Sequence, residues 1–325
     1  MIVIDRPAPS PRPAPLARQR GGAGTWLLAL LVLGGIAFAV YWFVLRDQGG
    51  AGSARLASSV VPASADGLVG IDAGGLLSSP DVEKLLGARG ANLPALKAKL
   101  ADAGIKIESL RSLVLAADLP DGAPPALIVA VEADADVKSA ESAIQAVRSL
   151  VPAQLAGALD LSNVQVFDGI VLAGAGPMFD QAKALASGAA AQTALAAPLL
   201  EVKGAIDTGA HVWGATALPP ALVAQLDLGP LEKFLGAAKP THAAASIRIG
   251  SKIDLTAALR LDGGDAKAIA DAMSGGIGVL GFMAGKDVGA LLKALVIGST
   301  GSTLTLSLSL SPEQLAVLDK LKGIL

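Results

Sequence analysis

His211 and His242 are the only imidazoles in the chain, which contains no cysteine. Imidazole is the usual general base near neutral pH and a frequent zinc ligand, and with a serine and a carboxylate it forms a hydrolytic triad. Neither an H-E-x-x-H nor a G-x-S-x-G motif accompanies these residues. Both precede strands predicted in the second half of the chain, so a shared site is one hypothesis. The favoured interpretation makes both replaceable and assigns no catalytic residue.

Three carboxylates, Glu132, Asp134 and Asp136, alternate at the end of a predicted strand. Alternate residues share one face of a strand, and carboxylate oxygens are the ligands that Ca²⁺ prefers. The spacing fails the EF-hand pattern, because Val137 stands at its glycine position. The favoured interpretation is therefore solvated charges with Asp136 capping the following helix, and no metal site is assigned.

A glycine-rich apolar stretch runs from Met273 to Gly285 and contains Gly276-Ile-Gly278-Val-Leu-Gly281. This matches G-x-G-x-x-G, which binds dinucleotides only between a strand and a helix of a βαβ unit. Here it follows a predicted helix, so no cofactor is assigned. The stretch is too short to span a bilayer. It is either a helix packed closely through its glycines or a lid over an apolar cavity.

The elements that position these residues alternate between strands and helices in two similar halves. Period-two patterns predict strands, and capping residues with proline at the first turn predict helix starts such as Pro177. The Asp168-Gly169 pair predicts a tight hairpin turn. The strands are predicted at 67–72, 112–118, 126–132, 164–172 (a hairpin), 211–217, 243–249, 253–261, 295–299 and 302–310, and helices at 93–103, 136–150 and 266–274.

This order predicts an α+β fold of two tandem split-βαβ, ferredoxin-like units with antiparallel sheets. The first unit is predicted at residues 56–188 and the second at 209–325, joined by a connecting segment at 189–208. The two units either form separate sheets or share one.

An unbroken apolar run from Trp26 to Leu45 carries no charge. About 20 such residues span a bilayer as a helix, so the run predicts a transmembrane anchor that contacts the lipid bilayer. Arginines precede the run at positions 6, 12, 18 and 20, which the positive-inside rule places in the cytoplasm. The predicted location is the inner membrane, single-pass, with the body in the periplasm or exterior.

The flanking segments fit this topology. Residues 1–25 alternate proline with other residues and predict a disordered cytoplasmic tail, and residues 46–55 predict a flexible linker. A cleaved signal peptide is the competing interpretation of the first 50 residues. Its apolar core usually has about 7–15 residues and ends in small side chains. The present run is longer and ends in aromatic residues.

Composition limits the partners. The net charge is −2, with 26 basic and 28 acidic residues, so there is no electrostatic reason to expect nucleic acid. Without cysteine there are no disulfides and no thiolate ligands.

Three segments, VPASADGLVGIDAGGLLSSPDVEKLL, RLDGGDAKAIADAM and LLKALVIGSTGSTLTLSLSLSPEQL, carry a family resemblance. Together they resemble bacterial single-pass envelope proteins of uncharacterised function with repeated α+β domains. The resemblance implies location and architecture, and it transfers no functional residue.

The leading hypothesis is a non-enzymatic, membrane-anchored envelope scaffold or protein-interaction module with a protein partner. The second is a binding protein for an apolar or lipid ligand held near Met273 to Gly285. The third is a hydrolase that uses a histidine. An elongated surface without a cavity would favour the first hypothesis, and an enclosed apolar pocket of about 300 Å³ or more would favour the second.

Overall fold

The structure of the chain is a computed structural model, which describes residues 55–81, 110–120, 126–133, 163–223, 234–283, 285–311, 313 and 314. Several predicted segments lie outside these residues. They are the tail 1–25, the apolar run 26–45, nearly all of the linker 46–55, and the helices predicted at 93–103 and 136–150.

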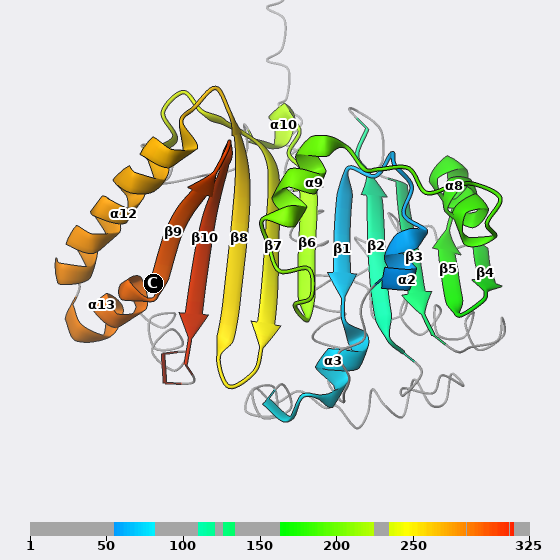
Figure 1. The fold of residues 1–325 in the computed structure, drawn as a ribbon, viewed down its shortest axis with the longest axis horizontal. Coiled ribbons are helices and arrows are strands. Elements are labelled where there is room, and N and C mark those ends of the chain that lie inside the picture. The colour runs from blue at the N-terminus through cyan, green and yellow to red at the C-terminus, as the bar shows by residue number, and fades with distance from the viewer. Residues whose placement is uncertain are drawn as a thin grey trace, which may run out of the picture.

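Ten strands form one sheet in the spatial order β4-β5-β3-β2-β1-β6-β7-β8-β10-β9 (Figure 1). Neighbouring strands in the described sheet are antiparallel throughout. The strands are β1 Gly67–Ile71, β2 Ser112–Asp118, β3 Ala126–Glu132, β4 Asn163–Phe167, β5 Ile170–Gly174, β6 Val212–Ala217, β7 Lys239–Ile249, β8 Ile253–Asp262, β9 Leu295–Thr300 and β10 Thr303–Leu310.

The predicted fold class of two tandem split-βαβ units is wrong. In a split-βαβ unit another strand lies between the two strands that a helix joins, whereas here β1, β2 and β3 lie side by side in chain order, as do β6, β7 and β8. Of the two alternatives left open for the sheet, the halves share one, because β1 pairs with β6 along its whole length. The sequence pattern placed the strands well but attached them to the wrong topology.

The two halves nevertheless repeat each other in strand order. Counted outward from the centre, the first half runs β1-β2-β3-β5-β4 and the second runs β6-β7-β8-β10-β9. A short helix precedes each central strand, α2 (Arg55–Ser59) before β1 and α9 (Ala197–Gly204) before β6. Another follows each, α3 (Ala73–Ser78) and α10 (Pro220–Val223). The halves are therefore repeats within one sheet, while the predicted boundaries 56–188 and 209–325 stay a prediction.

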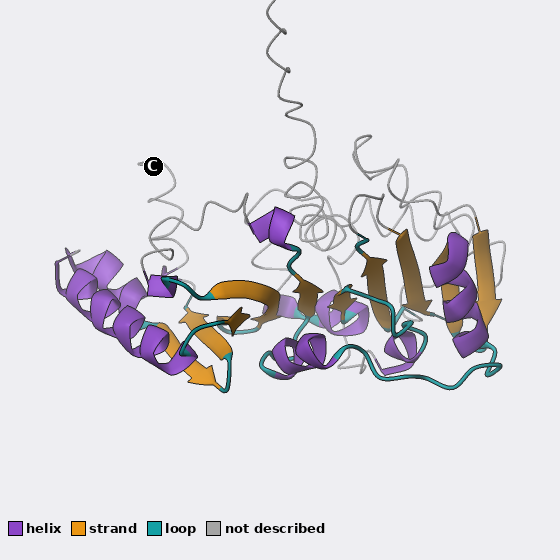
Figure 2. Cartoon of the chain, turned by 90° about the horizontal axis from the view of Figure 1, so that it is seen from above, coloured by secondary structure: helices purple, strands orange, loops and turns teal. Residues whose placement is uncertain are grey.

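Helices pack on both faces of the sheet (Figure 2). On one face α2 contacts β2 and β3, α8 (Gly176–Ala186) contacts β3 and β5, and α9 contacts β6, β7 and β8. α12 (Ala266–Met283) contacts β9 and β10 and is followed by α13 (Gly285–Lys293). Ala258 belongs to the core beneath α9, whereas its neighbour Leu259 packs with the core beneath α12. Adjacent strand residues point to opposite faces, so α12 lies on the other face from α9.

Individual elements follow the sequence closely. The hairpin predicted at 164–172 is confirmed, with Asp168 and Gly169 between β4 and β5 and Gly169 at φ +73°. Pro177 lies in the first turn of α8, as predicted. The helix predicted at 266–274 continues to Met283. The connecting segment 189–208 contains α9, whose buried residues are Leu199 and Val202.

The predicted membrane anchor is not supported by the structure. Among the described residues no helix is both long and apolar enough to cross a membrane. The longest, α12, carries Lys267 and Asp271 as an exposed ion pair. The run Trp26 to Leu45 lies outside the described residues. The description as a single-pass inner-membrane protein with a periplasmic or exterior body is corrected accordingly.

Candidate functional site

Residues 188–196, here called the strap, connect α8 to α9 and cross the sheet face that α2 and α9 cover (Figure 1). The strap is tied down at two points. The Ala190 N–H donates to the Ala184 carbonyl at 3.0 Å, and Gln192 Nε2 donates to the Ser58 carbonyl of α2 at 3.1 Å. Leu195 packs against the core. The strap therefore covers the space between α2 and α9.

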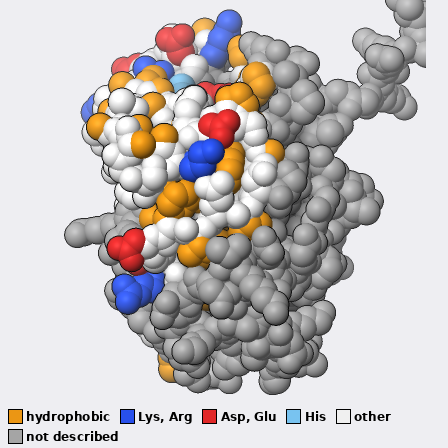
Figure 3. Space-filling view, turned by 90° about the vertical axis from the view of Figure 1, so that its right-hand side faces the viewer, with side chains coloured by type: hydrophobic (Ala, Val, Ile, Leu, Met, Phe, Trp, Pro, Cys, Tyr) orange, Lys and Arg blue, Asp and Glu red, His pale blue; other side chains and the backbone are white. Residues whose placement is uncertain are grey.

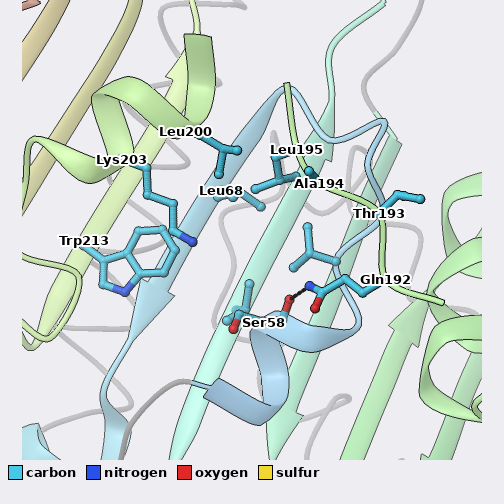
Figure 4. Close-up of a pocket in the computed structure, with 11 residues that line it drawn as sticks. Ser58, Leu68, Gln192, Thr193, Ala194, Leu195, Leu200, Lys203 and Trp213 are labelled. Atoms are coloured by element: carbon cyan, nitrogen blue, oxygen red, sulfur yellow. Dashed lines mark hydrogen bonds between the residues drawn. The ribbon is translucent and has the colours of Figure 1, made fainter. Parts of the chain in front are cut away.

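Beneath the strap lies a cleft of about 290 Å³, here called the strap cleft (Figure 4). The floor of the cleft is formed by Leu68 of β1 and Val114 of β2. The other lining residues are Ser58, Val61, Gln192, Thr193, Ala194, Leu195, Leu200, Lys203 and Trp213. Leu200 is 40% exposed, so the cleft opens to solvent beside α9.

Trp213 forms one wall of the strap cleft and is itself buried. It lies directly opposite Gly70 in the pairing of β6 with β1. A Cβ at Gly70 would overlap the indole ring. Because glycine has no side chain, the Trp213 ring can lie against β1 at this position. Gly70 therefore determines where this wall of the cleft lies.

Lys203 is the charged side chain among the described residues that line the strap cleft. Its Nζ lies 5.1 Å from the centroid of the Trp213 ring, within the range of a cation–π contact. Burial lowers the pKa of Lys203 below its ordinary value. Lys203 makes no ion pair with any carboxylate of the described residues. The cleft thus contains one partly desolvated cation beside an aromatic face.

Glu201 fixes the helix that carries Lys203. Its carboxylate accepts hydrogen bonds from the Thr303 hydroxyl at 2.7 Å and from Arg260 Nε at 2.9 Å. The Ser302 hydroxyl adds a third at 3.1 Å. The Thr303 hydroxyl, followed by Arg260 and Ser302, lowers the pKa of Glu201. Residues two apart lie on opposite sides of a helix, so this attachment to β8 and β10 leaves Lys203 turned toward the cleft.

The two histidines do not converge. The Ile249 N–H donates to His211 Nδ1 at 2.9 Å, whereas His242 lies opposite Ala217 at the other end of β6. At about 3.4 Å per residue, that strand separates them by roughly 20 Å. Burial lowers the pKa of both, with nearby Arg248 also lowering that of His211. The shared histidine site considered from the sequence is therefore not assembled.

Of the three carboxylates at the end of β3, the structure describes Glu132, which is held by neighbouring side chains. Glu132 is buried, accepts a hydrogen bond from the Ser112 hydroxyl at 3.0 Å and lies 3.6 Å from Arg111 Nη1. Asp134 and Asp136 lie outside the described residues. Within the part of the chain that the structure describes, no three histidine or carboxylate side chains gather closely enough to hold a metal ion.

The stretch from Met273 to Gly285 also differs from a binding loop. Gly276, Gly278 and Gly281 all lie inside α12, so the strand-to-helix turn of a dinucleotide site is not formed there. Met273 is buried in the core beneath α12. A Cβ at Gly276 would lie 3.2 Å from Cζ of Phe234. These contacts favour close packing over a lid.

The described surface at the β4 edge shows no accumulation of one charge. Acidic and basic side chains are interspersed there with apolar ones (Figure 3). Lys183 of α8, for example, pairs with Asp180 at 3.2 Å. Such a mixed surface lacks the basic stripe of a nucleic-acid interface.

Sequence reasoning missed Lys203, the strap and the cleft. Trp213 is the one tryptophan of the sequence beyond the N-terminal apolar run, but nothing next to it in the sequence indicates a binding site. The sequence gives no sign that α2 lies beside α9, because all five strands of the first half come between them in the chain. The proximity of those helices creates the site.

Comparison with known proteins adds little to this geometry. No protein-family model and no curated protein matches the chain. One solved structure, "Structure of crystal form I of TP0453", is similar with a TM-score of 0.37 and 11% identity, over 81% of this chain and 96% of that chain. A TM-score this low supports no conclusion about this chain. The resemblance to envelope proteins stays a prediction.

Proposed function

We propose that this chain is a non-enzymatic binding protein that holds a small apolar ligand in the strap cleft. The observation that carries the proposal is the cleft of about 290 Å³, which has an aliphatic floor and Trp213 in its wall, with polar side chains also among its lining. Ligand sites are usually concave and apolar, with few polar groups, and their volumes begin at about 300 Å³. The ligand is therefore small.

Catalysis by the strap cleft is not favoured, because general acid–base or nucleophilic chemistry needs groups that work together. Lys203 is the titratable side chain among the described lining residues, and neither histidine lines the cleft. The ligand site proposed here also differs from the one predicted at Met273 to Gly285. The scaffold hypothesis with a protein partner stays a prediction, without a site of its own.

Trp213 supplies a direct test. The full chain contains three tryptophans, so the W26F/W42F variant leaves Trp213 as the sole emitter. Titration with naphthalenemethanol, a small neutral apolar probe, should change Trp213 emission with saturation. Ala194→Phe places a ring in the cleft and should weaken binding about tenfold or more, which corresponds to about 1.4 kcal/mol.

The matched control is Ala191→Phe, the same change at an exposed strap position that does not line the cleft. It should leave the affinity unchanged. Absence of saturable binding to the unsubstituted cleft refutes the proposal and leaves the scaffold hypothesis. Equal weakening by both strap variants would place the bound probe elsewhere and refute it as well.

A further inference from the structure

We infer that Lys203 makes the strap cleft selective for a small amphiphile with a single negative charge, such as a carboxylate. The anionic head lies at Lys203 Nζ, and the apolar body lies along Leu68 and Leu200. This inference rests on the proposed function and adds the chemical class of the ligand.

The charge balance of the cleft favours an anion. Five other cations of the described residues are paired with carboxylates, whereas the half-buried Lys203 contacts the Trp213 ring. The paired cations are Arg111, Lys183, Arg248, Arg260 and Lys267. Glu201, the nearest acidic residue in sequence, is held by Arg260 and Thr303. A ligand that brings its own carboxylate would supply the missing counter-charge in a partly desolvated place, where such a contact is stronger than in water.

The same surroundings limit the ligand to one charge. Lys203 lies in the last turn of α9, where the helix carbonyls contribute partial negative charge. One lysine beside that helix end matches a monoanion, whereas a phosphate dianion would leave a charge uncompensated. The volume of about 290 Å³ equals that of only about ten water molecules, so the apolar body is short.

The arrangement of the lining residues gives the ligand a direction. Lys203 and Trp213 lie together at one side of the cleft, and Leu68, Leu200 and Leu195 follow beside them (Figure 4). A molecule with its charge at one end and its hydrocarbon at the other fits this order. Neutral apolar molecules would use the same aliphatic surface without the contact to Lys203.

A probe pair with one aromatic body separates the two contributions. Naphthoate and naphthalenemethanol share the naphthalene ring and differ in the charge of the head group. In the W26F/W42F chain, naphthoate should bind about tenfold more tightly than naphthalenemethanol at low salt, since a half-exposed charge pair contributes modestly. Lys203→Met should bring this ratio to about one by weakening naphthoate binding. Lys203→Arg should restore most of it. Lys252→Met, the same change at an exposed turn, should have no effect.

The pH dependence gives the same answer without a substitution at Lys203. The ammonium is charged below its pKa, which burial lowers, so the preference for naphthoate should disappear as pH rises through that pKa. Binding of neither probe refutes the proposed function itself. Equal affinity for both probes, or a preference retained by Lys203→Met, refutes this inference while the proposed function stands. Naphthyl phosphate binding more tightly than naphthoate would refute the limit to one charge.

Discussion

Gly70→Ala is expected to destabilise the protein because the new methyl group would overlap the Trp213 indole ring across the β1–β6 pair. Trp213 is 3% exposed, so the ring can move aside only by losing its packing or by entering the strap cleft. Overpacking a core typically costs about 1–3 kcal/mol. Replacing glycine in a strand otherwise gains about 0.5–1 kcal/mol by reducing the freedom of the unfolded chain. The free energy of unfolding should therefore fall by up to about 2.5 kcal/mol.

The effect of Gly70→Ala on stability should change sign when the indole ring is absent. In a Trp213→Ala background the methyl group meets no indole, so Gly70→Ala should be neutral or should stabilise by up to about 1 kcal/mol. The coupling energy of the double-mutant cycle should therefore be about 1–3 kcal/mol. Urea unfolding of the full chain, followed by far-ultraviolet circular dichroism, measures all four variants. Probe binding to the Gly70→Ala protein, with its ring displaced, should weaken in parallel.

The cycle also shows how this explanation can fail. If Gly70→Ala costs the same with and without the ring, the strain comes from the backbone of β1 and the indole has no part in it. If the slope of the unfolding free energy against urea concentration changes along with the midpoint, the variant has altered the compactness of the folded or unfolded state. The free energies of the four proteins then cannot be compared.

Two further predictions concern α12 and the histidines. Gly275 faces open space within α12, so Gly275→Ala should raise the free energy of unfolding by up to about 1 kcal/mol. Gly276→Ala should raise it less or lower it, because the new methyl group would meet Phe234. Equal urea midpoints of the two variants would contradict this prediction. Because the pKa of His211 is lowered in the folded protein, the unfolded chain binds a proton at a higher pH than the folded chain does. The free energy of unfolding should therefore be full above about pH 6.5 and fall as the pH drops toward the pKa of folded His211. His211→Gln, which can still accept from Ile249, should flatten that fall in urea unfolding across this range, and an unchanged slope would refute the assignment.

Local patterns in the sequence were sufficient for most strands. From Thr303 to Leu310 leucines alternate with hydroxyl residues, and this period allows only a strand with one face buried. At Asp168-Gly169 the second residue needs a positive φ, which glycine adopts without strain, so the turn and the register of its hairpin follow together. A helix was expected within the connecting segment that holds α9 (Ala197–Gly204), but the pattern did not give its bounds or its buried side. In its short sequence Leu199 and Val202 are buried but Leu200 faces outward, so apolar residues do not mark one side.

The topology depends on a pairing that such patterns do not contain. Alternation shows which face of a strand is buried, but it does not show which strand lies beside it. β1 and β6 are short, contain glycine or alanine at several positions, and belong to opposite halves of the chain. A split-βαβ unit would bury the same faces with other neighbours. The predicted fold class was wrong because it inserted a strand between strands that in fact lie side by side in chain order.

The strap cleft is a consequence of that central pairing. Its floor and α2 come from the first half of the sheet, whereas Trp213 and α9 come from the second. Had the halves formed separate sheets, Lys203 would have no Leu68 or Val114 near it and no apolar surface against which to hold a ligand. A bound ligand would therefore contact both halves across the β1–β6 junction. The site and the fold were missed together because the site exists only where the two halves meet.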